Sequence, residues 1–318
     1  MMANLSRREF LKRGTSASAA LAAASGIAAA TAVAAEADPD ARDSAALADL
    51  EARSQEQYAL LFDSTLCIGC RSCEIACAKH NELGRTPEEI FKGRPAEDAR
   101  ALAPDVFTYV TFHQVEADPT TAAFGKVQCM HCIEPACVSS CPVAALEKTP
   151  EGPVIWHEDL CLGCRYCMMA CPFLVPRFEW DSPNPRIRKC DMCHDRLQAG
   201  NPPACVAACP TKALVIGRRS ELLSEAHRRI EQRPRGYVHH VYGEKEAGGT
   251  NFLHLARRPF AELGYRRDLP MRSYRDLTRG AMAAIPYVFN GLALLLGAGA
   301  WLVQNRKTAG RTATGPRP

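Results

Sequence analysis

The stretch that decides the fold contains two cysteine motifs, CMHCIEPACVSSCP at residues 129–142 and CLGCRYCMMACP at residues 161–172, separated by eighteen residues. The second motif has the spacing C-x2-C-x2-C-x3-C-P. In this motif, the short loop of each C-x2-C unit presents two thiolates on one side. The x3 spacing begins a helix, which turns the fourth cysteine away from the other three. Pro142 and Pro172 lack a backbone N–H and hold the preceding residue in an extended conformation, so they redirect the chain directly after the fourth cysteine. Gly163 removes a side chain where backbone N–H groups must approach sulfur closely.

This spacing resembles the cluster-binding run of bacterial ferredoxins, in which three cysteines bind one iron–sulfur cluster and the fourth binds the neighbouring cluster. The resemblance implies two crossed sets of ligands. Ligand set 3 consists of Cys129, Cys132, Cys137 and Cys171. Ligand set 4 consists of Cys161, Cys164, Cys167 and Cys141.

All 16 cysteines of the 318-residue chain fall into four groups of four. Two further groups flank the central motifs, one at residues 67–77 and one at residues 190–209, and Pro210 follows the latter. By the same crossing, ligand set 1 consists of Cys67, Cys70, Cys73 and Cys209. Ligand set 2 consists of Cys190, Cys193, Cys205 and Cys77. The pattern predicts four 4Fe-4S clusters with no cysteine left over.

Two other uses of these cysteines compete with clusters. An exported chain with an even cysteine count is also typical of a disulfide scaffold, but disulfide frameworks do not repeat this motif. Four-cysteine zinc sites also use C-x2-C pairs, but three cysteines spaced three apart with a fourth four residues on exceed what zinc needs.

The first residues predict an export signal. Residues 6–12, Ser-Arg-Arg-Glu-Phe-Leu-Lys, resemble the twin-arginine signal. An alanine-rich, weakly hydrophobic region follows from Ala17 to Ala35, with cleavage options such as Ala32-Val33-Ala34. We therefore expect residues 1–35 to be a twin-arginine signal peptide, the alternative being an uncleaved anchor helix. Twin-arginine export carries folded proteins, which suits a chain loaded with clusters in the cytoplasm.

The charge of the chain gives no indication of nucleic-acid binding. The formal net charge is +4, and removal of the signal takes away four basic residues and one acidic residue. Each oxidised four-iron cluster with four thiolates adds about −2, so the loaded chain is expected to be net acidic. Basic residues near the cysteine motifs either offset cluster charge or form a solvated face. They are Arg165, Arg177, Arg186, Arg188 and Lys189.

The remaining pattern predicts an α+β fold with two interlocked modules, each resembling a bacterial ferredoxin with two 4Fe-4S clusters, plus insertions and one C-terminal transmembrane helix. We expect a linker at 36–62 and the four-cluster domain at 63–220. Strands are predicted from Val106 to Glu116, from Val154 to Trp156 and from Ala213 to Gly217.

Residues 221–280 are expected to form a helix and a docking arm. Ser220 is positioned to cap a helix from Glu221 to Gln232, and the basic segment from Tyr237 to Leu269 is predicted to be extended. Three histidines near the motifs, His80, His113 and His131, are expected to be polar loop residues. Trp156 and Trp180 are expected to cover the core.

Residues 281–303 predict a membrane anchor. They form a run of 23 residues without a charge, and at about 1.5 Å per residue such a helix crosses a hydrocarbon core of about 30 Å. Tyr287 and Trp301 stand near its two ends, where interfacial aromatics belong. A buried core helix is the alternative. Residues 304–318 form a basic tail. Together with the export signal, a single-pass protein at the periplasmic face of the bacterial inner membrane is expected.

Several segments resemble the HybA-like iron–sulfur subunits of hydrogenase-2-type uptake hydrogenases. These are DSTLCIGC at 63–70, KVQCMHCIEPACVSSCPVAAL at 126–146, CLGCRYCMMACP, and YGEKEAGGT at 242–250. The cysteine part is shared with electron-transfer subunits of molybdopterin oxidoreductases.

The resemblance implies a redox subunit with no substrate site of its own. Its partners would be the small and large subunits of a nickel–iron hydrogenase, and an integral membrane subunit that reacts with quinone. An alternative is the same role in a molybdopterin enzyme acting on formate, tetrathionate, polysulfide or dimethyl sulfoxide. A structural zinc scaffold is a third possibility, which the visible absorbance of iron–sulfur clusters would exclude.

Overall fold

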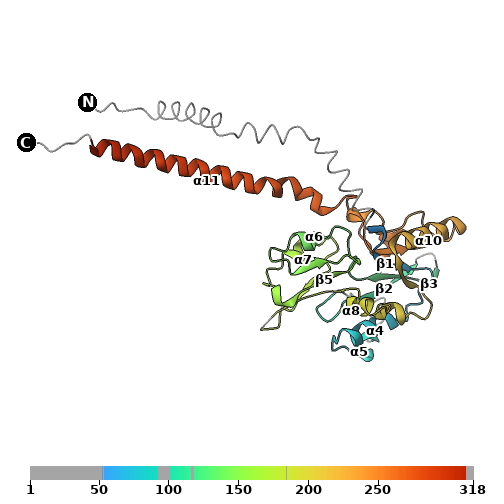
Figure 1. The fold of residues 1–318 in the computed structure, drawn as a ribbon. Helices are drawn as coiled ribbons and strands as arrows, with labels where there is room; N and C mark the ends of the chain where they lie inside the picture. The colour runs from blue at the N-terminus through green and yellow to red at the C-terminus, as the bar shows by residue number, and fades with distance from the viewer. Residues whose placement is uncertain (1–51, 53, 92–100, 116–117, 184, 313–318) are drawn as a thin grey trace, which may run out of the picture. The chain divides into compact units, whose positions relative to one another are not determined.

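The computed structural model describes residues 52, 54–91, 101–115, 118–183 and 185–312. The elements below belong to the compact unit that begins at Gln55. The predicted signal peptide and most of the predicted linker lie outside the described residues. The described chain mixes helices and strands, as the α+β class predicts (Figure 1).

A three-stranded sheet forms the centre of this unit. Strand β1 (Tyr58–Asp63) lies between β8 (Leu214–Arg218), which runs antiparallel to it, and β9 (Phe252–Leu255), which runs parallel. Ala59 and Leu61 of β1 pack in one hydrophobic cluster while Leu60 and Phe62 pack in another, because successive side chains of a strand point to opposite faces. The predicted linker boundary at residue 62 is therefore wrong, since the central strand lies within it.

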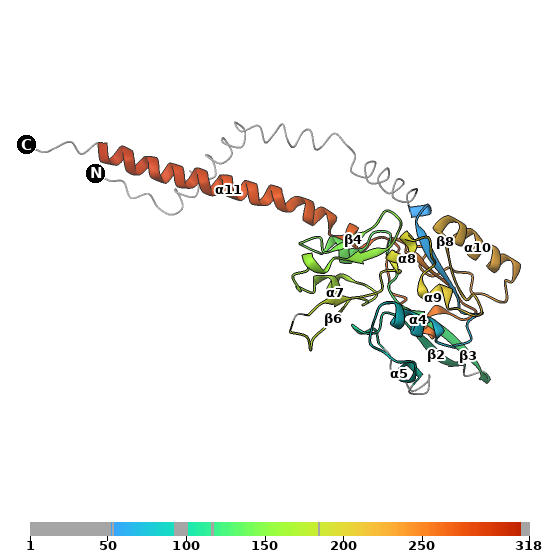
Figure 2. The ribbon, with the colours of Figure 1, turned by 60° about the horizontal axis from the view of Figure 1, so that its bottom comes forward.

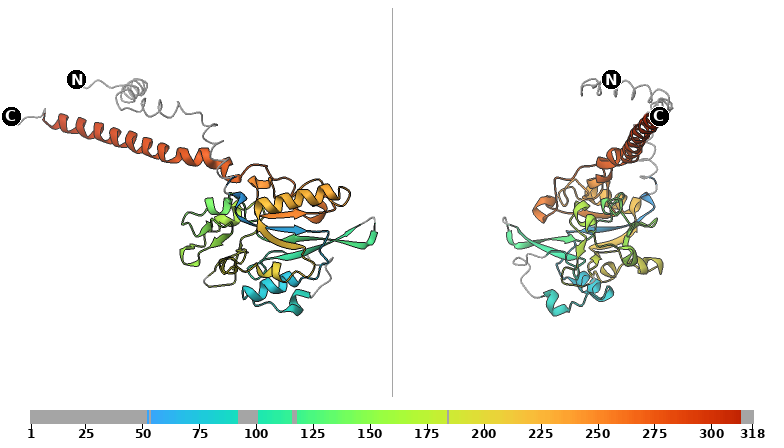
Figure 3. Two further views of the ribbon diagram at one scale, coloured as in Figure 1. Left: turned by 45° about the vertical axis from the view of Figure 1, so that its right-hand side comes forward. Right: turned by 90° about the vertical axis from the view of Figure 1, so that its left-hand side faces the viewer.

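Helix α10 (Arg219–Gln232) covers one face of this sheet (Figure 3). Leu222, Ala226 and Ile230 recur at helical spacing and pack against Ala59 and Leu61. The helix begins two residues earlier than predicted, and its first turn is closed by Glu221, which accepts from the Arg218 N–H at 3.3 Å.

Ser220 is not the cap of this helix. It lies inside the first turn, where its Oγ donates to the Gln55 carbonyl at 3.2 Å. The strand that precedes the helix, β8, nearly matches the predicted closing strand at residues 213–217.

A long hairpin occupies the insertion between the first two cysteine groups. Strand β2 (Tyr109–Val115) pairs antiparallel with β3 (Asp118–Val127). The sequence predicted the first strand and missed the second. Helix α5 (Pro87–Phe91) lies earlier in the same insertion. Figure 3 shows the hairpin projecting beyond the central sheet.

Two pairs of short helices carry cysteines. Helix α4 (Ser72–His80) packs against α9 (Ala204–Ala207), and α6 (Ala136–Ser139) packs against α7 (Tyr166–Ala170). The first pair joins the first and last cysteine groups, and the second pair joins the two middle groups. Figure 2 shows α4 and α9 near one another, with α7 on the other side of this unit.

Short ribbons and turns complete the region that extends from the middle groups into the last group. The ribbons are β4 (Leu146–Lys148) with β5 (Val154–Trp156), and β6 (Arg177–Phe178) with β7 (Ile187–Arg188). A 3-10 turn, η1 (Glu158–Leu160), and helix α8 (His194–Gln198) are the remaining elements. Strand β5 has the predicted bounds.

The segment after α10 is part of the core. It contains η2 (Glu246–Gly248), β9 and η3 (Phe260–Leu263). Phe252 and Leu255 are fully buried, and Tyr242 is 4% exposed. The predicted extended arm from Tyr237 to Leu269 is therefore wrong, because this segment supplies a strand and much of the apolar packing.

The last helix, α11 (Tyr274–Thr312), is 39 residues long. By length and composition, its segment Ala284–Asn305 is apolar enough to cross a membrane. The residue just before the helix, Ser273, is buried, and Arg275 in its first turn lies 3.7 Å from Glu134. Part of the predicted basic tail, residues 313–318, lies outside the described residues.

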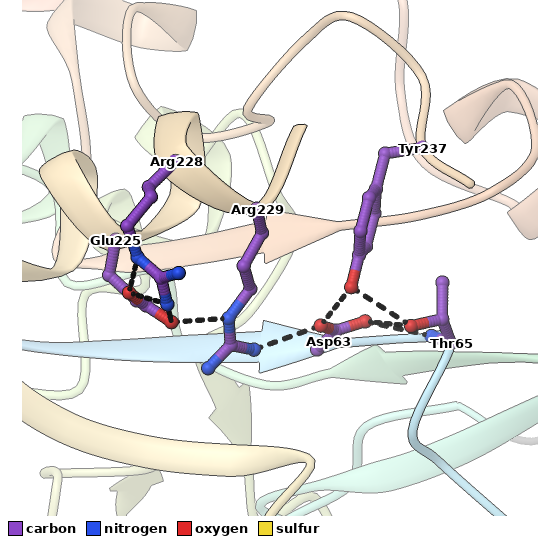
Figure 4. A network of polar contacts seen from close by, with 6 residues as sticks. All are labelled: Asp63, Thr65, Glu225, Arg228, Arg229 and Tyr237. Carbon is purple, nitrogen blue, oxygen red and sulfur yellow. Dashed lines mark hydrogen bonds and ion pairs between the residues drawn. The ribbon is translucent and has the colours of Figure 1, made fainter. Parts of the chain in front are cut away.

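A buried carboxylate fixes the end of β1. Asp63 is 1% exposed and accepts hydrogen bonds from the Arg229 guanidinium at 2.9 Å and from the Tyr237 hydroxyl at 2.8 Å (Figure 4). Thr65 donates to it through both its N–H, at 3.0 Å, and its hydroxyl, at 2.6 Å. One side chain thus joins the central strand, helix α10 and the segment that follows it.

We predict that Asp63→Asn lowers the free energy of unfolding by about 2–3 kcal/mol, because hydrogen bonds to a buried charged group are lost or weakened. Chemical denaturation of the full chain in detergent measures the effect. The matched control is Arg228→Met, since Arg228 is half exposed and its ion pair with Glu225 is worth less than about 1 kcal/mol. Equal losses in the two variants would contradict this role of Asp63.

Candidate metal centres

The packing of α6 against α7 brings together the cysteines of set 3. Burial raises the pKa of Cys132, and the thiolates of Cys171, Cys137 and Cys129 raise it further. Burial likewise raises the pKa of Cys171 to about 11, although N–H groups of Val175 and Phe173 act in the opposite direction. Cys171 therefore lies near three cysteines of the preceding motif.

The cysteines of set 4 line one hollow. A space of about 300 Å³, which opens to solvent, is bordered by all four members of the set, Cys141, Cys161, Cys164 and Cys167. Trp156 lines the same space, as its predicted covering role requires. Burial raises the pKa of Cys167 to about 11, and the thiolates of Cys161, Cys164 and Cys141 add to the rise.

The first and last cysteine groups meet where α4 packs against α9. Burial, together with the thiolates of Cys73 and Cys209, raises the pKa of Cys67 to about 11. Burial also raises the pKa of Cys77, with added repulsion from Cys205 and Cys193. Members of set 1 and members of set 2 are thus each drawn from both ends of the cysteine region.

Set 1 and set 4 each include two cysteines from a loop with the same sequence pattern and the same conformation. Residues 67–71 read CIGCR and residues 161–165 read CLGCR. In both loops the glycine and the arginine are left-handed, with φ of +69° at Gly69, +67° at Gly163, 54° at Arg71 and 64° at Arg165. This turn directs N–H groups toward the sulfurs, and the Gly69 N–H is one that lowers the pKa of Cys67. The importance of Gly163 was expected, and the same role of Gly69 follows from the repeated pentapeptide.

Hydrogen-bond donors surround the sulfurs. The Ala145 N–H points to Cys141 Sγ at 3.2 Å, and the Met192 N–H points to Cys190 Sγ at 3.4 Å. The Asn81 side-chain amide lies 3.5 Å from Cys77 Sγ. Such donors stabilise sulfur that carries negative charge, so they suit thiolate ligands.

The donor set fits a multinuclear cluster better than a single ion. All sixteen cysteines are free thiols within the described residues. In the same part of the chain, no three His, Cys, Asp or Glu side chains are placed to hold one metal ion. Burial and mutual repulsion raise the pKa of cysteines in each of the four sets, and a metal binds the thiolate, so a bound group would have to supply positive charge. Four iron ions in each cluster would supply it.

Several other predicted residues have partners that are not cysteines. Arg186 and Arg188 form ion pairs with Glu179 at 3.2 and 3.3 Å, so a carboxylate balances their charge. Trp180 is 65% exposed, but its ring packs edge-on against the buried Phe178 ring at 4.9 Å, which agrees with a covering role, and the Arg165 guanidinium lies over it at 4.9 Å.

The histidines differ from one another. His80 ends helix α4 and pairs with Asp195 at 3.1 Å, and His113 lies within strand β2, 2.9 Å from the Thr111 hydroxyl, so the expected loop position is wrong for both. His131 lies outside the helices and strands, as expected, but it is fully buried and accepts from the Val154 N–H at 2.9 Å.

Sequence reasoning missed two lysines whose charge lies inside the cysteine region. Lys126 is 1% exposed, and Lys148 donates to the carbonyls of His131 at 3.1 Å and Gly152 at 2.6 Å. Lys189, which was predicted, is buried and donates to the carbonyls of Val154 and Cys190. A lysine inside a strand or ribbon gives no sequence signal of burial, because its neighbours come from elsewhere in the chain.

Comparison with known proteins identifies the cofactor. Residues 120–219 match the model of a 4Fe-4S dicluster domain. The hydrogenase-2 operon protein HybA of Escherichia coli O157:H7 is 37% identical over 256 residues, covering 70% of this chain and 75% of that protein. The nitrate-inducible formate dehydrogenase iron–sulfur subunit of E. coli K12 is 34% identical over 234 residues, covering 71% and 78%. A protein of Nitratidesulfovibrio vulgaris is 43% identical over 254 residues, covering 80% and 68%. These similarities support multiple 4Fe-4S clusters.

We predict that Gly69→Ala destabilises the chain by about 2–5 kcal/mol and lowers its iron content. A Cβ at this position would lie 2.2 Å from the Phe124 ring, which packs edge-on against Phe112. Left-handed strain of about 1–2 kcal/mol therefore adds to overpacking of about 1–3 kcal/mol.

The matched control for this prediction is Gly163→Ala, whose Cβ would meet its nearest neighbour, the Phe178 ring, at 3.6 Å. It should show the left-handed strain alone. Iron-to-protein ratio and thermal unfolding, both measured anaerobically, compare the two variants. Equal losses in both would show that the Phe124 contact is unimportant.

Proposed function

The chain belongs to the family of iron–sulfur electron-transfer subunits that includes HybA and the formate dehydrogenase iron–sulfur subunits, and from this premise we propose a role for it in hydrogen oxidation. In this proposal the chain takes electrons from a periplasmic nickel–iron hydrogenase, made of a small and a large subunit. It passes them to an integral membrane subunit that reacts with quinone.

The observation that carries the proposal is that sixteen free thiols lie in one region of the fold, where cysteines of distant motifs come close to one another. Sets 1 to 4, as defined above, would each hold one 4Fe-4S cluster, four in all, in two interlocked ferredoxin-like modules. When bound, these clusters supply one-electron transfer at potentials set by hydrogen bonding, charge and solvent exposure.

The residues of the chain bind the clusters, orient them and exclude water. Among the sixteen cysteines, all of them described, Cys164 is the one that is exposed. The others are buried or partly buried among apolar side chains such as Val154, Phe178 and Ile187. Hydrogen chemistry itself would belong to the partner, so the chain would act as a redox subunit and not as an enzyme alone.

The two ends of the chain support a place at the periplasmic face of the inner membrane. The apolar part of α11, Ala284–Asn305, is long enough for a single membrane pass. The twin-arginine motif at residues 6–12 supports export of the folded chain. Residues 1–35 would be removed as a signal peptide or, in the alternative, kept as an anchor.

A second candidate is the same role in a formate dehydrogenase or a related molybdopterin enzyme. The 34% identity to a formate dehydrogenase iron–sulfur subunit favours it. The export motif on this chain favours the hydrogenase, because molybdopterin systems often carry that motif on the catalytic subunit.

Metal analysis of the complex purified from membranes separates these candidates. The hydrogenase proposal expects about sixteen iron ions per chain, with nickel in a co-purifying catalytic subunit. The same iron with molybdenum would replace it by the second candidate. Zinc without iron would contradict both.

The crossed ligand sets predict which cluster each cysteine serves. Cys171→Ser should damage the cluster held by Cys129, Cys132 and Cys137, because Cys171 is close enough to all three for their charges to affect one another. Low-temperature EPR of the reduced protein, compared with Cys129→Ser, measures this. The matched control, Cys141→Ser, should affect the cluster of set 4. Loss of the set 4 signal in Cys171→Ser, with set 3 intact, would overturn the crossing.

A further inference from the structure

A lysine of the insertion hairpin lies inside the region that holds sets 1 and 2. Lys126, near the end of β3, is 1% exposed. Its ammonium group donates to the Thr108 hydroxyl at 2.5 Å and to Cys73 Sγ at 3.5 Å. Its backbone N–H donates to the Tyr265 hydroxyl at 3.0 Å, which fixes the strand at this point.

The charge of Lys126 acts on both cysteine sets. It lowers the pKa of Cys67 and Cys73, which belong to set 1. It also lowers the pKa of Cys77 and Cys205, which belong to set 2. The ammonium group contacts set 1 at Cys73, and the same helix α4 carries Cys77 of set 2 one turn further on and packs against α9, which carries Cys205.

The surroundings of this lysine are buried and include negatively charged groups. Cys73 Sγ lies 3.5 Å from the ammonium group, and Glu74 follows Cys73 on α4. Glu74 is itself buried, and its Oε1 accepts from the Val110 N–H at 2.8 Å.

We propose that Lys126 is a fixed positive charge shared by the cluster sites of sets 1 and 2, and that it raises the reduction potentials of both clusters. The inference rests on the proposed function of the sixteen cysteines. It also gives the β2–β3 hairpin a role: the insertion delivers a charge to a place that neither cysteine motif reaches.

The physical reason is electrostatic. Reduction adds one negative charge to a cluster, and a nearby cation in a poorly solvated interior stabilises the reduced form more than the oxidised form. Solvent cannot replace the cation, because Lys126 and its partners Cys73 and Glu74 are all buried. Removal of one ammonium group should therefore change two of the four potentials in the same direction.

Other lysines in the cysteine region show the same principle at set 3. Lys148 lowers the pKa of Cys132, and Lys189 lowers that of Cys137 and Cys171. At set 4 the largest charge effects on Cys167 come from the cysteines themselves. Lys126 is the best lysine to test, because its ammonium group contacts a cysteine sulfur directly, whereas that of Lys148 donates to two backbone carbonyls.

The test is an EPR-monitored redox titration of the full complex carrying Lys126→Met. Methionine has similar length and no charge, and the Thr108 hydroxyl keeps its contacts with the Val127 carbonyl and the Gln128 side chain. The reduction equilibrium constants of the clusters in sets 1 and 2 should each fall at least tenfold, which is 59 mV for one electron. Sets 3 and 4 should not change.

The matched control is Lys79→Met. Lys79 is exposed on α4, two residues after Cys77, so its charge is screened by solvent and no potential should move. Thr108→Val is a second variant that keeps the charge and removes its anchor, and it should shift sets 1 and 2 in the same direction by less. It remains informative if Lys126→Met fails to load iron.

The outcomes separate this inference from the proposed function. Absence of clusters in the unmodified complex would defeat the proposed function. Four clusters whose potentials do not move in Lys126→Met, or all of which move equally, would overturn the role of Lys126 alone. Lower potentials at sets 1 and 2, with an unchanged Lys79→Met, would support it.

Discussion

Thiolates buried close together repel one another, and this repulsion is the constraint on which the rest of the fold depends. Burial and neighbouring sulfurs raise the pKa of cysteines in every one of the four sets. Bound iron removes most of this repulsion, but the clusters themselves remain negative. The chain compensates with N–H groups from left-handed turns and with buried ammonium groups, both held by elements outside the cysteine motifs.

The central sheet makes this compensation possible. Strand β1 leads directly into the first cysteine group, β8 follows the last group, and β9 completes the sheet. Because β1 pairs with β8, helices α4 and α9 are brought against one another. The Asp63 network fixes the end of β1 to α10 and to the segment after it, so the position of the first cysteine loop depends on residues more than a hundred positions away.

Local features of the fold could be predicted from the sequence. The motif spacing indicated the cysteine groups, the bounds of β5 were correct, and helix α10 was predicted with its correct end, because each depends on residues close in sequence. Features defined by distant partners could not be predicted. The apolar run of β1 was assigned to a linker, since neither of its partner strands is nearby. The segment that contains β9 was interpreted as an arm because one short parallel strand leaves no periodic pattern.

The residues of the candidate site also fall into those that local sequence predicts and those that depend on distant partners. The sixteen cysteines and Gly163 were found from spacing alone, and the assignment to crossed sets came from the ferredoxin resemblance and stays a prediction. Lys126 lies in a segment that resembles the HybA-like family, but the sequence predicted no role for it. Its burial depends on Thr108, Tyr265 and Cys73, which lie in three separate parts of the chain. Charge compensation depends on the tertiary structure, so the buried cations near the cysteines could not be predicted from the sequence pattern.

The position of β1 in the sheet also constrains the order of folding during synthesis. This strand emerges early from the ribosome, yet both of its partners, β8 and β9, are made much later. The two middle cysteine groups, by contrast, are near neighbours in sequence and are complete before β8 exists. The sheet depends on contacts between residues far apart in sequence, and such contacts form slowly, so the middle region is able to fold before the outer one.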